Sequence, residues 1–126
     1  MCRVRRFLFL GVFLVVPLVA GCSGGGAGSP ARLASPQAQA RGRTLFERHC
    51  SICHGVNADG KGPRSAALEP PPTDFSDPAW GAKMPPQAVF LAIREGVAGT
   101  SMPAWPVFDK DETWDLVAFV RSVAGK

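Results

Sequence analysis

Cys50-Ser51-Ile52-Cys53-His54 is the stretch of this 126-residue chain on which the interpretation of the rest depends. Two thiols three positions apart, followed directly by a histidine, form the C-x-x-C-H pattern of covalent c-type haem attachment. On the first turn of a helical segment, both sulfurs can reach the two vinyl groups of one porphyrin, and the next imidazole can bind the iron. The motif therefore predicts one haem c, bound covalently by Cys50 and Cys53, with His54 as an axial iron ligand.

Length and charge restrict the other possibilities. The chain is long enough for one small domain. Its formal charge is +4, but Arg3, Arg5 and Arg6 belong to an N-terminal leader, and without them the charge falls to about +1. No Lys/Arg cluster follows the leader, so we expect no nucleic-acid partner.

The cysteines are all accounted for without a disulfide. Cys2 lies in the leader, Cys22 lies at a predicted processing site, and the other two belong to the haem motif. Export would permit a structural disulfide, but no pair of cysteines is left to form one.

Residues 1–21 are predicted to be an export signal, because three arginines precede an apolar run that is too short to span a bilayer comfortably. Val19-Ala20-Gly21-Cys22 resembles the lipobox of bacterial lipoproteins. This resemblance implies cleavage before Cys22 and lipidation of its side chain, and Ser23 favours the outer membrane. An ordinary signal peptide or an uncleaved anchor is the alternative. Residues 22–36 are then a flexible Gly/Ser/Ala tether without structure of its own, and residues 37–126 form the domain.

Three helices are expected in this domain. The first begins at Pro36 with Ser35 as N-cap, and a glycine within it, Gly42, requires the close approach of a second helix. Another covers about 87–95, with Val89, Phe90 and Ile93 on its buried face and Gly96 at its C-cap. The last begins after Asp109, which forms a capping box with Glu112, and continues with Leu116, Phe119, Val120 and Val123 at helical spacing. No stretch alternates as a strand does, so the fold class is all-α.

A second axial ligand must come from elsewhere in the chain. The candidates are Met84, Met102, His49 and the lysines. Met102 is the strongest, because it lies before Pro103 in an irregular segment far enough from His54 for the chain to return to the opposite face of the ring. Met84 remains an alternative, and His49 is interpreted as a surface residue that points away from the haem.

Taken together, these features resemble a class I cytochrome c. They are the C-x-x-C-H motif, the Asp59-Gly60-Lys61-Gly62-Pro63 loop, the Leu68–Phe75 proline segment, Met102-Pro103-Ala104-Trp105 and the closing helix. More narrowly, they are similar to the small single-haem c-type subunits of haem–copper oxidases and to related bacterial electron carriers.

The resemblance implies three to four helices around one haem, with the first and last helices crossing. Gly42 and Phe46 would then face Leu116, Phe119 and Val120. A carbonyl within Pro70–Pro72 would accept the free N–H of His54. The aromatic residues that would form the wall of the haem pocket are Phe75, Trp80, Phe90, Trp105 and Trp114.

The function expected from this site is single-electron transfer, with the iron cycling between Fe(II) and Fe(III). Filled axial positions leave no place for substrate, so we expect no catalytic residues and no enzymatic activity. Partners would be redox proteins, reached from a lipid anchor on the periplasmic side. The alternatives are an electron-transfer subunit of a respiratory oxidase or periplasmic dehydrogenase and, less favoured, a haem-based gas sensor. A thiol–disulfide oxidoreductase would need a βαβ setting, and a zinc site would need four ligands at metal spacing.

Overall fold

The computed structural model describes residue 26 and residues 28–124. The predicted signal segment 1–21 and Cys22 lie outside the described residues. The described residues contain six α-helices, one short 3-10 helix and no strand, which confirms the all-α prediction. The helices are α1 (Pro30–Leu33), α2 (Pro36–His49), α3 (Ser51–His54), α4 (Pro78–Lys83), α5 (Pro86–Glu95) and α6 (Lys110–Val123), and the 3-10 helix is η1 (Ser65–Ala67).

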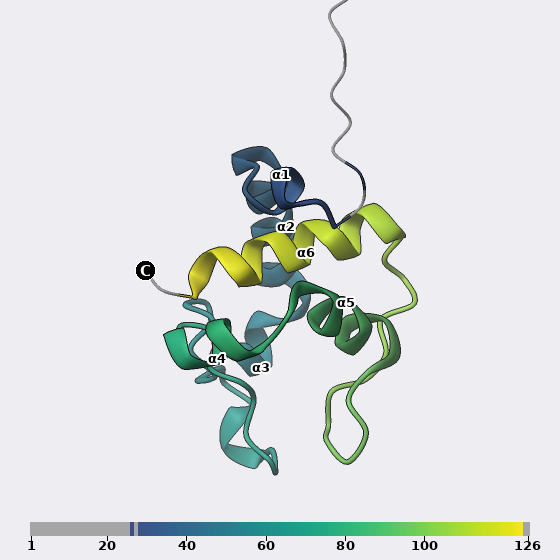
Figure 1. Cartoon of the computed structure of the whole chain (residues 1–126). Helices are drawn as coiled ribbons and strands as arrows, with labels where there is room; N and C mark the ends of the chain where they lie inside the picture. Colours follow the sequence, from purple (N-terminus) through teal and green to yellow (C-terminus); the bar gives the residue numbers. More distant parts are fainter. Residues whose placement is uncertain (1–25, 27, 125–126) are drawn as a thin grey trace, which may run out of the picture.

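The two long helices, α2 and α6, cross at close range, as predicted (Figure 1). A Cβ atom built on Gly42 would overlap the backbone carbonyl of Asp115, so only glycine permits this approach. One turn further along α2, the ring of Phe46 is 1% exposed and lies 5.0 Å, centroid to centroid, from the ring of Phe119. The crossing therefore forms the centre of the hydrophobic core.

The helix ends follow the local signals in the sequence. Ser35 caps α2 by accepting a hydrogen bond from the backbone N–H of Ala38. At the start of α6, Asp109 and Glu112 form both hydrogen bonds of the predicted capping box. Gly96 follows α5 with φ = 75°, a backbone conformation that favours glycine.

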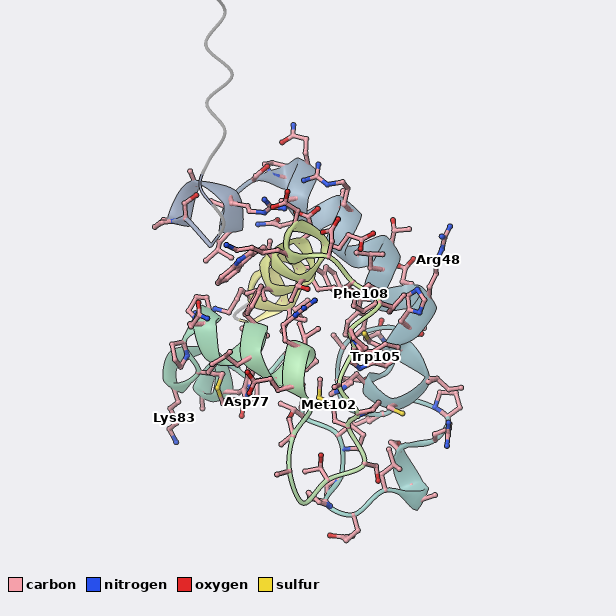
Figure 2. All side chains as sticks on the ribbon, turned by 90° about the vertical axis from the view of Figure 1, so that its right-hand side faces the viewer. Arg48, Asp77, Lys83, Met102, Trp105 and Phe108 are labelled. Carbon is pink, nitrogen blue, oxygen red and sulfur yellow. The ribbon has the colours of Figure 1, made fainter. Side chains whose placement is uncertain are left out.

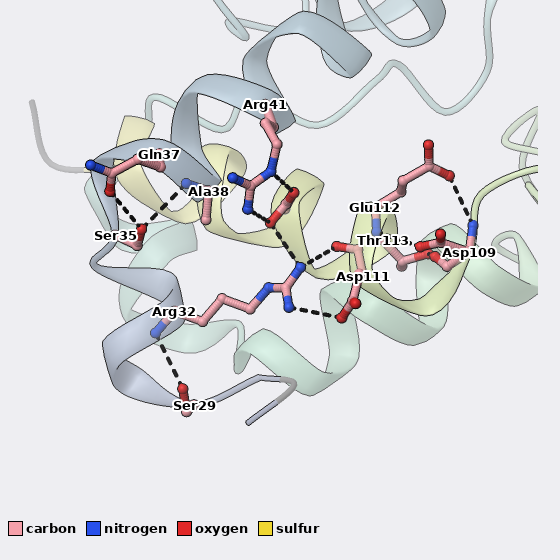
Figure 3. A network of polar contacts seen from close by, with 11 residues as sticks. Ser29, Arg32, Ser35, Gln37, Ala38, Arg41, Asp109, Asp111, Glu112 and Thr113 are labelled. Carbon is pink, nitrogen blue, oxygen red and sulfur yellow. Dashed lines mark hydrogen bonds and ion pairs between the residues drawn. The ribbon is translucent and has the colours of Figure 1, made fainter. Parts of the chain in front are cut away.

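The first departure from the predictions lies before α2. Residues 22–36 were expected to be a flexible tether, and this is wrong for residues 28–35, which include α1 and pack against α6. Arg32 reaches from α1 to the side chain and the backbone carbonyl of Asp111 at 2.8 and 2.7 Å, and to Asp115 at 2.9 Å (Figure 3). We call residues 28–35 the N-terminal strap.

Asp115 connects the strap to both long helices. Its side chain is only 5% exposed, and it also accepts two hydrogen bonds from Arg41 on α2. These bonds and the charge of Asp115 raise the pKa of the Arg41 guanidinium. A buried carboxylate requires such partners, because leaving it unpaired in the interior would be strongly unfavourable.

The remaining elements lie on the other side of α6. In Figure 1, α3, α4 and α5 lie below α6 in the view, together with the long loops, whereas α1 lies above it. The six helices of the described residues are two more than the upper limit of the predicted three to four. The additional helices, α1 and α4, are both short. Within residues 28–124, no helix is long and apolar enough to cross a membrane.

The crossing yields the first prediction. Gly42→Ala should lower the free energy of unfolding by about 1–3 kcal/mol, because the new methyl group would force α2 away from the Asp115 carbonyl. Chemical denaturation followed by circular dichroism measures this change. Thr44→Ala, at an exposed position of the same helix, is the control and should stay within about 0.5 kcal/mol of wild type. Equal effects of the two substitutions would contradict the close crossing.

Candidate functional site

An apolar cavity of about 310 Å³ lies between α2, α3, α5, α6 and the loops that join them. Both thiols of the C-x-x-C-H motif, its histidine and two methionines line it: Cys50, Cys53, His54, Met84 and Met102. The α6 side is contributed by Leu116 and Val120. Two thiols, an imidazole and two thioethers around an otherwise apolar space are a donor set and a lining that fit a haem.

The motif lies where α2 gives way to α3. The backbone N–H groups of Cys53 and His54 both donate to the carbonyl of Cys50, which closes one helical turn around the motif. The following loop donates hydrogen bonds to the free carbonyls of this turn. The Gly60 N–H donates to the backbone carbonyl of His54, and the Gly62 N–H donates to that of Cys53. A Cβ on Gly62 would lie 2.5 Å from the carbonyl oxygen of Ile52, so the backbone of this loop packs directly against the backbone of α3.

The Cys50 thiol is held in its neutral form. Burial, together with the neighbouring Cys53, raises the pKa of Cys50 to about 12. Reactive thiols of disulfide oxidoreductases have lowered pKa values and form thiolates readily. No strand is present in the described part of the chain to provide a βαβ setting. Both observations argue against the thiol–disulfide alternative.

The imidazole of His54 is positioned by the segment that follows the prolines. Its Nδ1 lies 3.2 Å from the carbonyl oxygen of Thr73. A carbonyl can only accept, so Nδ1 carries the hydrogen in this contact and Nε2 keeps its lone pair. The expected acceptor within Pro70–Pro72 is therefore wrong by one residue: the carbonyl that faces the ring belongs to Thr73, directly after the prolines. Burial lowers the pKa of His54, and the Thr73 carbonyl opposes this only in part, so the ring stays neutral.

The two methionines reach the cavity from opposite ends of α5. Met84 is the C-cap of α4, and its carbonyl accepts a hydrogen bond from Arg121. Met102 lies in the loop after α5, where its N–H donates to Thr100 Oγ1 and its carbonyl accepts from Val97 N–H. Figure 2 shows Met102 and Trp105 on this loop. No lysine among the described residues lines the cavity, and Lys83 points outward in Figure 2.

His49 does not lie where the sequence suggested. It is half-buried and contributes to the cavity lining, rather than pointing away from it. Its ring meets Trp105 and Phe108 edge-on, at centroid distances of 6.0 and 5.2 Å. Helical periodicity could not reveal this, because both partners come from the loop that precedes α6.

The aromatic wall was predicted correctly in part. Phe75, Trp80 and Trp105 line the cavity. Phe90 and Trp114 do not line it: they stack on each other with centroids 4.6 Å apart. Trp114 lies on the α6 face that meets the strap, where a Cβ on Gly28 would lie 2.6 Å from its ring. The strap therefore packs against Trp114, a side chain that was expected in the wall of the haem pocket.

An all-α fold with a helix-borne C-x-x-C-H motif at an apolar cavity defines a c-type cytochrome domain. The chain belongs to the family described as cytochrome c oxidase, cbb3-type, subunit III, whose model matches residues 37–120. Its cofactor is therefore haem c, attached covalently, as the sequence predicted. The N-terminal strap precedes the matched residues.

Several solved structures are similar to this chain. A chain of the Kuenenia stuttgartiensis reducing HAO-like protein complex Kustc0457/Kustc0458 is 27% identical with a TM-score of 0.61, over 71% of this chain but only 45% of that one. The KustC0563 c-type cytochrome is 30% identical with a TM-score of 0.52, over 65% of this chain and 95% of that one. Cytochrome cL of Methylophaga aminisulfidivorans is 26% identical with a TM-score of 0.55, over 76% and 61%.

Covalent attachment gives the second prediction. In protein made with the cytochrome c maturation machinery, wild type should keep its haem on a denaturing gel, where peroxidase staining detects it. Replacing both Cys50 and Cys53 by alanine should abolish the stain, and the double variant should lose stability because the cavity lacks its covalently held core. Each single variant should retain haem through one thioether, visible as a shifted pyridine haemochrome band. A double variant that still stained would refute the attachment sites.

Proposed function

We propose that this chain is a periplasmic single-electron carrier whose haem iron is ligated by His54 and Met102. The observation that carries this proposal is that Met102, far from the C-x-x-C-H motif in the sequence, lines the same apolar cavity as His54. A haem bound there supplies the one-electron Fe(III)/Fe(II) couple, at a potential raised by thioether ligation. The chain contributes two covalent attachment points, a neutral imidazole and a soft sulfur donor.

The surroundings of the two methionines favour Met102 over Met84. Helix α4, which ends at Met84, packs through Trp80 onto Phe75, whose ring stacks on His54. Met84 thus belongs to the elements that support the imidazole. Met102 lies in the loop between α5 and α6, whose Trp105 packs against His49. This loop is separate from the segment of Thr73 and Phe75 that contacts the imidazole. A second ligand is supplied more readily from a loop that does not also support His54.

If His54 and Met102 both bind the iron, they leave no coordination position for a substrate, and this supports a carrier rather than an enzyme. The surrounding residues serve to keep water from the iron and to keep the ligands in place in both oxidation states. Small rearrangement between the two states is what rapid electron exchange requires.

For the position of the carrier, we propose a lipid on Cys22 after removal of residues 1–21, with the outer membrane favoured. Because residues 28–35 dock on α6, only the chain between Cys22 and Gly28 is available as a tether. The six Cα–Cα steps from Cys22 to Gly28 span at most roughly 20 Å when extended. Such a short tether supports redox partners that lie on, or close to, the same membrane.

A second candidate function is an electron-transfer subunit within a larger enzyme. It is favoured by the family description as an oxidase subunit and by the similarity to one chain of the Kuenenia complex. Native mass and co-purification distinguish the two: a carrier should run alone after mild detergent extraction, whereas a subunit should run with its enzyme.

The ligand assignment yields the third prediction. Met102→Leu conserves volume but removes the sulfur, so the long-wavelength charge-transfer band of the oxidised protein should vanish and the midpoint potential should fall. Absorption spectroscopy and redox titration measure these changes. Met84→Leu is the matched control in the same cavity and should retain the band. The opposite result, with the band lost only in Met84→Leu, would identify Met84 as the second iron ligand.

Lipidation yields the fourth prediction. Cys22→Ala should release the protein from the membrane fraction or leave its leader unprocessed, whereas wild type should partition into detergent. Mass spectrometry of the mature N-terminus should show the acyl chains on Cys22. Cys2→Ala, which changes the other cysteine of the N-terminal segment, should not alter processing. An acyl-free mature protein that stays soluble in the periplasm would refute the anchor but leave the haem site untouched.

A further inference from the structure

The imidazole of His54 makes two contacts with one short segment of the chain. Thr73 accepts from its edge at Nδ1, and the ring of Phe75 stacks on its face. The two ring centroids lie 4.6 Å apart and the planes differ by only 18°. The other aromatic neighbour of this imidazole, Phe46, is farther away at 6.3 Å and is tilted by 51°. Phe75 is therefore the flat surface against which the ring of His54 rests.

Phe75 is itself held on several sides. Its backbone N–H donates to the carbonyl of Ala58 at 2.8 Å, which fixes the segment to the loop after α3. Trp80 packs on it at a centroid distance of 4.9 Å, and Phe46 meets it nearly edge-on at 6.3 Å. The phenyl ring therefore cannot move away easily to let the imidazole turn.

The backbone around Phe75 is equally constrained. The Asp74 carboxylate accepts from both the N–H and the hydroxyl of Ser76, which fixes the turn directly after the phenyl ring. A Cβ on Gly60 would lie 2.6 Å from the carbonyl oxygen of Pro72, so the segment lies directly against the loop after α3. This support is of the kind expected for groups that orient a metal ligand.

The two contacts restrict different movements. A hydrogen bond at Nδ1 directs one edge of the imidazole toward Thr73 but still allows the ring plane to tilt about that bond. A stacked phenyl ring opposes the tilt, because turning the plane would lose the face-to-face contact. The orientation of an axial imidazole plane governs how its orbitals overlap with those of the iron, and this overlap influences the electronic structure of the haem.

We propose that Phe75 is a positioning residue for the axial ligand: by stacking on His54 it sets the orientation of the imidazole plane, and through it the electronic structure and potential of the iron. The proposal rests on the proposed ligation by His54. It goes beyond a packing role, in which the phenyl ring would only fill space in the wall of the cavity.

The test compares holoprotein variants in the oxidised state. Phe75→Leu and Phe75→Met remove the flat ring and keep an apolar side chain, whereas Phe75→Tyr keeps the ring. Phe90→Leu is the matched control, because Phe90 also stacks on an aromatic ring but outside the haem cavity. Proton NMR reports the hyperfine shifts of the haem methyl groups, which depend on the imidazole orientation, and redox titration and thermal unfolding accompany it.

We expect Phe75→Leu and Phe75→Met to change the order or spread of the haem methyl resonances and to shift the midpoint potential. Phe75→Tyr should keep the wild-type pattern, and Phe90→Leu should lower the unfolding temperature without altering the resonances. A wild-type methyl pattern in both Phe75→Leu and Phe75→Met, with only a lower unfolding temperature, would overturn the proposal. If wild type itself shows no imidazole ligand resonances, the assignment of His54 fails instead, and this outcome is separate from the first.

Discussion

The close crossing of α2 and α6 at Gly42 is the constraint on which the rest of this structure depends. It brings the backbones of two helices from opposite ends of the domain into contact, where a single methyl group would separate them. The C-terminal end of α2 carries Cys50, and one side of α6 contributes Leu116 and Val120 to the cavity. Thus the same contact that forms the core also fixes two walls of the haem site relative to each other.

Around this crossing, the site is assembled mainly from loops, and each loop is held by backbone hydrogen bonds. The loop after α3 closes on the carbonyls of the motif, and the segment at Thr73 and Phe75 is joined to that loop through Ala58. Few of these segments are helical, and they contribute little apolar packing of their own. A haem in the cavity would therefore supply much of the apolar core of this half of the domain. A domain of this size buries little apolar surface by itself, so a covalent prosthetic group also serves as a structural element.

The other face of α6 packs against the strap. There, Asp115 is enclosed by Arg32 and Arg41, and Trp114 lies beneath Gly28. The strap helix α1 lies on the opposite side of α6 from α3, α4 and α5 (Figure 1), and the strap precedes the residues that match the family. The cavity is lined from α6 by Leu116 and Val120, whereas the strap contacts Trp114 and Asp115, so the two use different side chains of one helix.

The sequence by itself determined the cofactor, the fold class and the long helices, because these depend on local signals: the spacing of Cys50, Cys53 and His54, the cap at Ser35, and the capping box at Asp109. It also indicated the helix crossing, since a glycine within a helix implies a close neighbour. Only the tertiary structure decided that α1 docks, that Thr73 rather than a proline faces His54, and that His49 lines the cavity while Phe90 and Trp114 do not. The reason is that these features depend on contacts between residues distant in the chain, and neither helical periodicity nor turn composition specifies which of several apolar faces a side chain meets.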